Sequence, residues 1–563
     1  MNKRLGLIIF ILFIGGAAII GRLFIIQVLG QNLYRAWAIG QQTFFSTIAG
    51  ERGEILFSNR EKLATDTVKK FAYISPKEIK QEDKEKIEIA LGQILDLDQN
   101  FIKEQINQDS FYELLKKSLS DREIDQIQRL NLLGIYIGQE STRVYPQEEM
   151  ASQVIGFVNA QNLGQYGLEG YYQDILAGKE TTLVQEKGGK DLILSSSGKK
   201  VQGNDLLLTL DYNIQFQAEK MLAQARKDYN FKSGGIIVIN PNDGEVLALA
   251  NYPSFDPNNY DKEKDLGIFK NPVLQKIFEP GSVFKPITMA AAIDENKITP
   301  QTTYTDEGVV KIGNRLIYNY ANRTYGLNTM TQVLEKSINT GAVFAQQQLG
   351  SEMFLKYLES FGFFEKTGID LQGEVYSENK ELKKGYEINF ATASFGQGIE
   401  ITPIQLVRAF SAIANKGKMV KPYLVKKIIN SDGSTTETKP ELSREIISPQ
   451  TSSQVASMMV SVIENGYSKK AKIPGYFIAG KTGTAQVPWG ALEISKSGYS
   501  DETVQSFLGF APAYNPKFLI LVKLDNPEAK TAEYSAMPIF RDLAKYIIDL
   551  WQIPPDYEDG SHR

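Results

Sequence analysis

The sequence contains no cysteine and only one histidine, His562, in 563 residues. The absence of cysteine excludes disulfide bonds, thiolate nucleophiles and zinc sites with cysteine ligands. His562 is the penultimate residue of a tail rich in Pro, Asp and Glu, whereas a Ser-His-Asp triad needs an imidazole that is held rigidly against its serine. A catalytic serine in this chain would therefore need a different base.

The sequence also lacks a strong net charge. Its formal charge is −4, and lysine and arginine are interspersed with aspartate and glutamate. No basic stripe is available to follow a phosphate backbone, so nucleic-acid binding is not expected. Hydrophobic residues make up 42% of the chain, which is typical of globular proteins, and the length indicates several domains of ~150 residues each.

One long apolar run departs from this globular composition. Residues 5–29 are interrupted by Arg22 and Gln27 and follow Lys3 and Arg4. As a helix, this run would be ~37 Å long, which is enough to cross a hydrocarbon core of ~30 Å. A cleaved signal peptide is the alternative, but the apolar pattern continues past Arg22 and no small-x-small cleavage site follows. We therefore expect an uncleaved single-pass anchor in the plasma membrane, with a cytoplasmic N-terminus and the rest of the chain outside.

Residues from about 40 to 200 have a mixed pattern of short strands and amphipathic helices. Strand-like runs occur at residues 70–74 and 134–138, and helical runs at residues 84–95 and 111–119. Residues 185–203 are rich in Lys, Gly and Ser, so we expect an exposed loop or a domain boundary there. A second domain should begin near Asn204.

The second domain has the pattern of an α+β fold. Its first two strand candidates flank the sequence Asn-Pro-Asn-Asp-Gly, which favours a tight hairpin, and its other strand candidates come late in the chain. Helical runs lie between the two groups, so we predict an antiparallel sheet that is split in sequence by a helical block. The strand candidates are residues 235–239, 245–250, 476–486, 505–511 and 518–524, and the helical candidates are residues 284–293, 332–337, 402–415 and 538–551.

Ser282 and Lys285 form an S-x-x-K motif at a predicted helix start. Pro286 is tolerated only in the first turn of a helix, so the helix should begin at about Ser282. This start places the serine hydroxyl at the positive end of the helix, where developing negative charge is stabilised. Lys285 shares a helix face with Ser282 and could remove its proton if burial lowers the lysine pKa.

Two further motifs follow in settings that suit a catalytic cleft. Ser337-Ile338-Asn339 lies between two helix-like runs, so we expect it to form a corner that directs side chains into a cleft. Lys481-Thr482-Gly483-Thr484 continues an apolar strand-like run. Glycine at position 483 would let a ligand backbone approach the strand closely, as a substrate that adds itself to the sheet requires.

Each motif also occurs elsewhere in the chain in a setting that predicts no catalytic role. All four such matches lie in expected loops or turns, and a solvated loop or turn is the simpler interpretation of each. The matches are Ser196 with Lys199, Ser197 with Lys200, Ser377 with Asn379, and Lys366-Thr367-Gly368. Only the set that begins at Ser282 combines a helix, a corner and a strand in the order S-x-x-K, S-x-N, K-T-G, which is closely similar to the motif set of penicillin-binding proteins and class A β-lactamases.

Beyond these motifs, the chain resembles the class B, transpeptidase-only penicillin-binding proteins along nearly its whole length after the anchor. Phe278 departs from the family pattern, because tyrosine is common at that position. The matching landmarks are Arg52-Gly53-Glu54-Ile55, Asn59-Arg60, Leu63-Ala64, Arg143-x-Tyr145-Pro146, Gly156, Gly167-Leu168-Glu169, Tyr172, Gly178, Asp205-Leu206, Leu208-Thr209-Leu210-Asp211, Thr367-Gly368-Ile369-Asp370, Ser394-Phe395-Gly396-Gln397-Gly398 and Thr402-Pro403.

The resemblance implies a serine acyl-enzyme mechanism with no metal and no organic cofactor. Ser282 would attack the penultimate D-alanine carbonyl of a stem peptide, with Lys285 as the base. Ser337 would relay a proton to the leaving amine, and Asn339 would hold Lys285 and the substrate amide. The residues implied for catalysis are Ser282, Lys285, Ser337, Asn339 and Lys481, and those implied for binding the substrate and its terminal carboxylate are Lys481, Thr482, Gly483 and Thr484.

The resemblance also implies a multidomain α+β architecture. Residues 1–30 would be a cytoplasmic tip and transmembrane helix, and residues 31–203 a mixed α/β pedestal domain of the dimerisation type. Residues 204–551 would be a transpeptidase domain with an antiparallel sheet and a helical subdomain, and residues 552–563 a tail.

The implied activity is cross-linking of peptidoglycan stem peptides that end in D-Ala-D-Ala, with β-lactams as covalent inhibitors. The moderate length of the chain and its compact pedestal domain favour a role in septum formation or sporulation over a role in elongation. A polytopic membrane glycosyltransferase and other division proteins are the expected partners. A β-lactam sensor, a β-lactamase-like hydrolase and a non-catalytic scaffold for such a glycosyltransferase remain alternatives.

Overall fold

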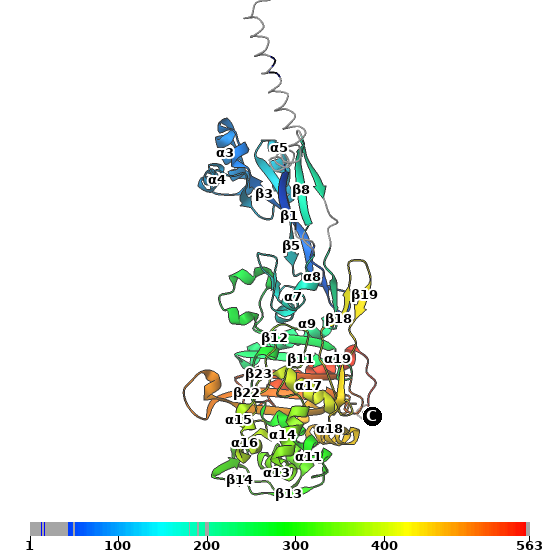
Figure 1. Cartoon of the computed structure of the whole chain (residues 1–563). Helices are drawn as coiled ribbons and strands as arrows, with labels where there is room; N and C mark the ends of the chain where they lie inside the picture. Colours follow the sequence, from blue (N-terminus) through cyan, green and yellow to red (C-terminus); the bar gives the residue numbers. More distant parts are fainter. Residues whose placement is uncertain are drawn as a thin grey trace, which may run out of the picture. The chain divides into compact units, whose positions relative to one another are not determined.

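The computed structural model describes residues 13, 16, 43–48, 51–178, 181–188, 191–196 and 202–558. Apart from Phe13 and Gly16, the predicted anchor lies outside these residues, and so does His562. Within the described ranges, no helix is both long and apolar enough to span a membrane. The chain divides into a smaller unit, Met1–Gly53 with Ala177–Asn204, and a larger unit, Glu54–Leu176 with Asp205–Arg563 (Figure 1).

The smaller unit contains a three-stranded antiparallel sheet. Strand β8 (Thr181–Gly188) lies between β1 (Thr43–Ile48) and β9 (Asp191–Ser196). The sequence predicts an exposed loop or a domain boundary over residues 185–203, and the loop is wrong for the residues in β8 and β9. The reason is that the apolar run Leu192-Ile193-Leu194 supports a strand, although Lys, Gly and Ser surround it.

In the larger unit, strands from both halves of the chain form one sheet. The strand order is β19-β18-β10-β2-β3-β4, and β5 pairs with β3 off this path. Strand β10 pairs in parallel with β2 and antiparallel with β18, so the sheet joins the N-terminal region to the second half of the unit. The strands are β2 (Ile55–Leu56), β3 (Lys62–Ile74), β4 (Glu113–Lys116), β5 (Ile135–Val144), β10 (Asp205–Leu208), β18 (Val425–Ile429) and β19 (Thr435–Glu437).

Short helices pack against this N-terminal sheet region. Helix α3 (Lys84–Leu95) confirms the predicted helix over residues 84–95, and its buried residues Ile87, Leu91 and Leu95 share one helix face. The helix predicted over residues 111–119 is wrong, because Glu113–Lys116 form β4 beside β3. Leu115 is the only buried residue of β4. The apolar residues of this segment therefore place one side chain in the core from a strand and do not form a helix face.

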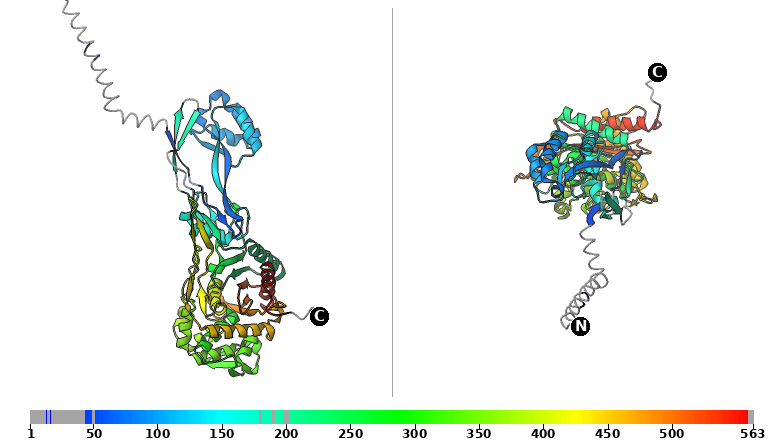
Figure 2. Two further views of the ribbon diagram at one scale, coloured as in Figure 1. Left: turned by 90° about the vertical axis from the view of Figure 1, so that its right-hand side faces the viewer. Right: turned by 90° about the horizontal axis from the view of Figure 1, so that it is seen from above.

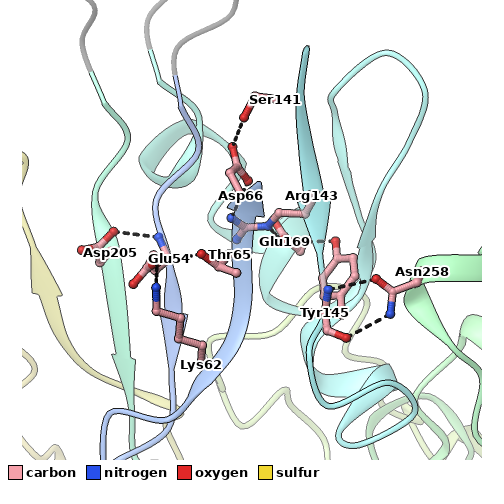
Figure 3. Close-up of polar contacts among 10 residues, drawn as sticks. All are labelled: Glu54, Lys62, Thr65, Asp66, Ser141, Arg143, Tyr145, Glu169, Asp205 and Asn258. Atoms are coloured by element: carbon pink, nitrogen blue, oxygen red, sulfur yellow. Dashed lines mark hydrogen bonds and ion pairs between the residues drawn. The ribbon is translucent and has the colours of Figure 1, made fainter. Parts of the chain in front are cut away.

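A buried arginine ties the N-terminal region of the larger unit together (Figure 3). Arg143 Nη1 lies 3.0 Å from Asp66 Oδ1, and its Nε lies 2.8 Å from Glu169 Oε1. Tyr145 lies two residues after Arg143, just beyond the end of β5. Its backbone exchanges two 2.9 Å hydrogen bonds with the side chain of Asn258, which belongs to the second half of the unit. Arg143 therefore joins β5 to β3 and to Glu169, and Tyr145 joins the end of β5 to the second half of the unit.

The second half of the larger unit is built on a five-stranded antiparallel sheet of order β12-β11-β23-β22-β21. The predicted hairpin and late strands are present, which confirms the α+β pattern. The strands are β11 (Ser233–Ile239), β12 (Val246–Tyr252), β21 (Ala479–Pro488), β22 (Tyr499–Ala511) and β23 (Phe518–Asp525).

Helices cover both faces of this sheet. Alternate residues of β23, such as Ile520 and Val522, pack with helices α9 (Tyr212–Tyr229) and α19 (Ala536–Leu550), which lie side by side (Figure 2). The intervening residues Leu519 and Leu521 belong to the core on the other face, where the helical block lies. The central strand is therefore apolar on both faces. The block includes α11 (Lys285–Asp294), α12 (Met330–Glu335), α13 (Asn339–Leu349), α14 (Ser351–Ser360), α16 (Glu387–Ala393), α17 (Pro403–Ala414) and α18 (Pro449–Glu464).

Candidate active site

The turn that carries Ser282 is held tightly against strand β21. A 3₁₀ turn, Gly281–Phe284, precedes α11, so Ser282 lies in this turn and the α-helix begins at Lys285, with Pro286 in its first turn. Gly281 has a φ of +64°, and a Cβ at this position would lie 2.9 Å from the Cβ of Ala485. Only glycine combines this backbone conformation with such a close approach.

Lys285 is completely buried and lies beside Ser282. Its Nζ is 3.0 Å from Ser282 Oγ, 2.6 Å from the backbone oxygen of Ser337, 3.2 Å from Ser337 Oγ and 2.8 Å from Asn339 Oδ1. Burial, and secondarily the positive charge of Lys481, hold the pKa of Lys285 well below its usual range. The amine is therefore poised to be neutral.

The hydrogen-bond partners of Lys285 are compatible with a neutral amine. A neutral amine has two N–H donors and one lone pair. The oxygens of Ser337 O and Asn339 Oδ1 can only accept, so they take the two N–H groups. The lone pair is then available to accept the hydroxyl proton of Ser282. This arrangement fits a general base.

Ser337 and Asn339 occupy a corner between α12 and α13, as the sequence predicts. Ser337 has a φ of +57°, a left-handed conformation that is unfavourable for a residue with a side chain. This conformation brings both its backbone oxygen and its hydroxyl to Lys285. The Nδ2 of Asn339 donates to the backbone oxygen of Tyr318 at 3.1 Å, which leaves its Oδ1 directed at Lys285.

Lys481 reaches the same corner from strand β21. Its Nζ is 3.1 Å from Ser337 Oγ and 3.1 Å from the backbone oxygen of Thr482, and the residue is 1% exposed. Burial lowers the pKa of Lys481 to about 8, although Glu533 acts in the opposite direction. Ser337 Oγ therefore lies between two lysine amines, in a position to pass a proton between them or to a leaving group.

Gly483 and Thr484 make close contacts within the protein. A Cβ at Gly483 would lie 2.6 Å from Ser506 Oγ and 2.8 Å from the backbone oxygen of Pro280. Glycine is needed here because the Ser282 turn packs on the strand, which is a reason that the sequence did not show. Thr484 Oγ1 accepts a 3.2 Å hydrogen bond from the N–H of Ala532.

Two of the alternative motif matches have local structural contacts. Ser377 Oγ bonds to Glu400 at 2.8 Å, and Asn379 also bonds to the backbone of Glu400. Thr367 donates to Glu374 through both its N–H and its hydroxyl. The alternatives in the 196–200 region cannot be compared in this way, because Ser197, Lys199 and Lys200 lie outside the described residues.

The group that orients Asn339 was not predicted from the sequence. The backbone oxygen of Tyr318 is held near the corner by a buried network in which Thr340 Oγ1 donates to Asp306 at 2.6 Å and Asn319 Nδ2 donates to both oxygens of Asp306. A backbone carbonyl leaves no trace in a sequence motif. The aspartate, asparagine and threonine lie too far apart along the chain to suggest one network.

The chain matches two known domain families. Residues 234–545 match the family described as "Penicillin binding protein transpeptidase domain". Residues 47–208 match the family described as "Penicillin-binding Protein dimerisation domain". The first match includes all of the site residues described above.

Relatives and solved structures agree with these matches. The "Stage V sporulation protein D" of Bacillus subtilis is 33% identical over 496 residues, which cover 85% of this chain and 74% of that protein. The "Peptidoglycan D,D-transpeptidase FtsI homolog" of Mesostigma viride is 30% identical over 595 residues and covers 100% of this chain and 98% of that protein. Penicillin binding protein 3 of Mycobacterium tuberculosis, solved in complex with aztreonam, has a TM-score of 0.70 and 26% identity, covering 91% of this chain and 99% of that chain.

Proposed function

The chain belongs to the class B penicillin-binding proteins, and on this basis we propose how its residues carry out peptidoglycan D,D-transpeptidation through a serine acyl-enzyme. One observation supports the assignment of roles. The buried amine of Lys285 contacts the hydroxyls of Ser282 and Ser337, and the amine of Lys481 contacts the hydroxyl of Ser337. These groups come from a helix start, a helix corner and a strand, and they supply a nucleophile, a base and a proton relay.

In the first half-reaction, Ser282 Oγ attacks the carbonyl of the penultimate D-alanine while Lys285 accepts its proton. The backbone N–H groups of Ser282 and Thr484 stabilise the oxyanion, and such donors are worth ~3 kcal/mol each. The proton then passes through Ser337 to the nitrogen of the terminal D-alanine, which leaves. In the second half-reaction, an amine of a neighbouring stem peptide attacks the acyl carbonyl and loses a proton to Lys285. The ester bond to Ser282 then breaks, and Ser282 Oγ takes this proton back from Lys285.

Lys481 and its neighbours bind the terminal carboxylate of the donor peptide. The ammonium of Lys481 supplies the charge, and the hydroxyls of Thr482 and Thr484 supply hydrogen bonds. Gly483 keeps the strand close to the Ser282 turn. Asn339 orients Lys285 and binds the substrate amide.

β-Lactams acylate the same serine, because they resemble the D-Ala-D-Ala end of the donor peptide. The complex of the Mycobacterium tuberculosis relative with aztreonam supports this extension to the present chain. A sensor or a β-lactamase-like hydrolase would share Ser282 and Lys285 but would not transfer the acyl group to an amine. The residues found together at the site support catalysis rather than an inert scaffold, although a catalytic protein can also bind a membrane glycosyltransferase.

We place the activity at the septum, because relatives include a sporulation protein and an FtsI homologue. Residues 1–30 form the proposed anchor, and residues 31–203 and 204–551 the pedestal and transpeptidase domains, followed by a tail at residues 552–563. A polytopic glycosyltransferase and other division proteins are the proposed partners. A fluorescent fusion should therefore concentrate at division sites, and uniform side-wall labelling would argue for elongation instead.

Labelling with fluorescent penicillin tests the catalytic assignment. Wild type should be labelled covalently, Ser282→Ala should not be labelled, and the matched variants Ser196→Ala and Ser197→Ala should be labelled normally. Persistent labelling of the Ser282 variant would refute the assignment. Transfer of a donor peptide to an added amine, measured with wild type, separates a transpeptidase from a sensor or a hydrolase.

A further inference from the structure

Glu279, three residues before Ser282, joins two segments that are distant from it in sequence. Its Oε1 accepts a 3.0 Å hydrogen bond from the N–H of Gly398, and its Oε2 accepts a 3.0 Å hydrogen bond from the hydroxyl of Tyr499. Gly398 belongs to the loop after α16, and Tyr499 is the first residue of β22. The side chain therefore connects the Ser282 turn, this loop and the β21–β22 hairpin.

The turn itself does not depend on the Glu279 side chain. The N–H of Gly281 donates to the oxygen of Gly396 at 2.9 Å, and Phe278 and Ile401 exchange two backbone hydrogen bonds of 2.9 and 3.0 Å. These backbone contacts fix the turn against the loop. The bond from Gly398 then holds the Glu279 carboxylate, so that its other oxygen meets Tyr499.

Tyr499 marks the outer end of the hairpin that carries the K-T-G residues. It pairs with Pro488 at the last position of β21, and residues 489–498 lie beyond this pair. Lys481 lies near the opposite end of the same strand. Gln486 is exposed, and Val487 and Pro488 are only partly buried. The hydrogen bond from Tyr499 to Glu279 therefore holds a strand end that has little apolar packing.

The charge of Glu279 is poorly compensated. Among the described residues, no lysine or arginine lies within ion-pair distance of its carboxylate. The groups that face it are Tyr499, the N–H of Gly398 and the like charge of Glu400. Burial raises the pKa of Glu279 to about 7, with Glu400 contributing. A partly buried carboxylate that has two hydrogen bonds to distant segments and a perturbed pKa is a candidate for a functional role.

We propose that Glu279 is a positioning residue, which holds the outer half of β21 (residues 485–488) in register with Ser282 so that an extended donor peptide lies along the strand. This inference rests on the proposed function, in which the donor peptide binds along β21. A short ligand that contacts only residues 481–484 does not need the outer half. The requirement for Glu279 should therefore grow with the length of the donor.

The test compares Glu279→Ala, Glu279→Gln and Tyr499→Phe with the control Tyr514→Phe, which removes an exposed hydroxyl elsewhere (Tyr514 is 56% exposed). Three quantities are measured: the acylation rate with a small chromogenic β-lactam, kcat and KM for a short and an extended peptide thioester donor, and hydrogen exchange of residues 486–503 by mass spectrometry. The exchange measurement does not depend on chemistry at Ser282.

Loss of both hydrogen bonds in Glu279→Ala should raise KM for the extended donor by ~10- to 100-fold, with faster exchange in the hairpin. Acylation by the small β-lactam and kcat should change by less than ~3-fold, since the backbone contacts keep the Ser282 turn in place. Tyr499→Phe should raise the same KM by ~3- to 10-fold. Glu279→Gln keeps an acceptor for Gly398 and a partner for Tyr499, so it should restore most of the affinity.

Unchanged KM and unchanged exchange in Glu279→Ala would overturn the proposal. Equal losses for the small β-lactam and for both donors would also overturn it, because Glu279 would then serve the Ser282 turn rather than the strand. If wild type itself fails to react with the β-lactam, the proposed function fails, whereas the exchange result still shows whether Glu279 orders the hairpin.

Discussion

Replacement of Lys285 by arginine separates base catalysis from charge stabilisation. Arginine keeps a positive charge but cannot lose a proton near neutral pH. In the structure, Lys285 Nζ lies 3.0 Å from Ser282 Oγ. In a neutral amine, Ser337 O and Asn339 Oδ1 would take the two N–H groups and leave the lone pair for the Ser282 hydroxyl. A guanidinium has no such lone pair. We therefore expect Lys285→Arg to fold but to lose its ability to activate Ser282.

The expected loss follows from the usual contribution of general-base catalysis. Acylation should slow by ~10²- to 10⁴-fold, which corresponds to about 2.7–5.4 kcal/mol of activation free energy. In wild type, the acylation rate should rise with pH through the lowered pKa of Lys285, because only the neutral amine accepts a proton. The variant should lose this dependence.

The assay is the second-order acylation rate with a chromogenic β-lactam across a range of pH. A thermal melt shows whether the variant is folded. Lys366→Arg serves as a matched control, because the K-T-G sequence at residues 366–368 lies outside the helices and strands. If Lys285→Arg acylates within a few-fold of wild type, Lys285 is an electrostatic contributor. The base would then be another group, with Lys481 acting through Ser337 as the first candidate.

Three other predictions concern the terminal carboxylate, the buried arginine and the anchor. The affinity for a donor with a free terminal carboxylate should fall as pH rises through about 8, because Lys481 loses its charge there. A donor with an amidated terminus should not show this fall. Equal pH profiles for the two donors would contradict the role of Lys481. Arg143→Met should lower the free energy of unfolding by about 3–5 kcal/mol in a denaturant titration, because it removes the ion pairs that Arg143 makes with the buried Glu169 and the partly buried Asp66. Lys62→Met, at an exposed ion pair, should cost at most about 1 kcal/mol. Protease added outside intact spheroplasts should degrade everything after the anchor, and a protected product of nearly full length would show that the topology is wrong.

Local features of the sequence predicted the catalytic half of the fold well. The Asp-Gly turn between two apolar runs predicted the β11–β12 hairpin, and the 3.6-residue spacing of apolar residues predicted α11, α17 and α19. These features depend on residues within a few positions of one another, so no knowledge of the rest of the fold is needed. The failures, β4 in place of a helix and strands β8 and β9 in place of a loop, arose where a short segment is defined by pairing with a distant strand.

The sequence by itself determined which residues are proposed as the reactive groups, and their order. Ser282 and Lys285 are separated by one helical turn, so their contact could be predicted from spacing alone. The absence of cysteine and the terminal position of His562 already directed attention to a lysine base.

Tertiary structure decided how these groups work together. Ser337 and Lys481 are 144 residues apart, and Glu279 and Tyr499 are 220 residues apart, yet each pair is in hydrogen-bond contact. The lowered pKa of Lys285 arises from complete burial, and burial depends on the packing of the helical block against the sheet. Such contacts and the exclusion of water are properties of the whole folded chain, so neither can be obtained from the spacing of residues in a motif.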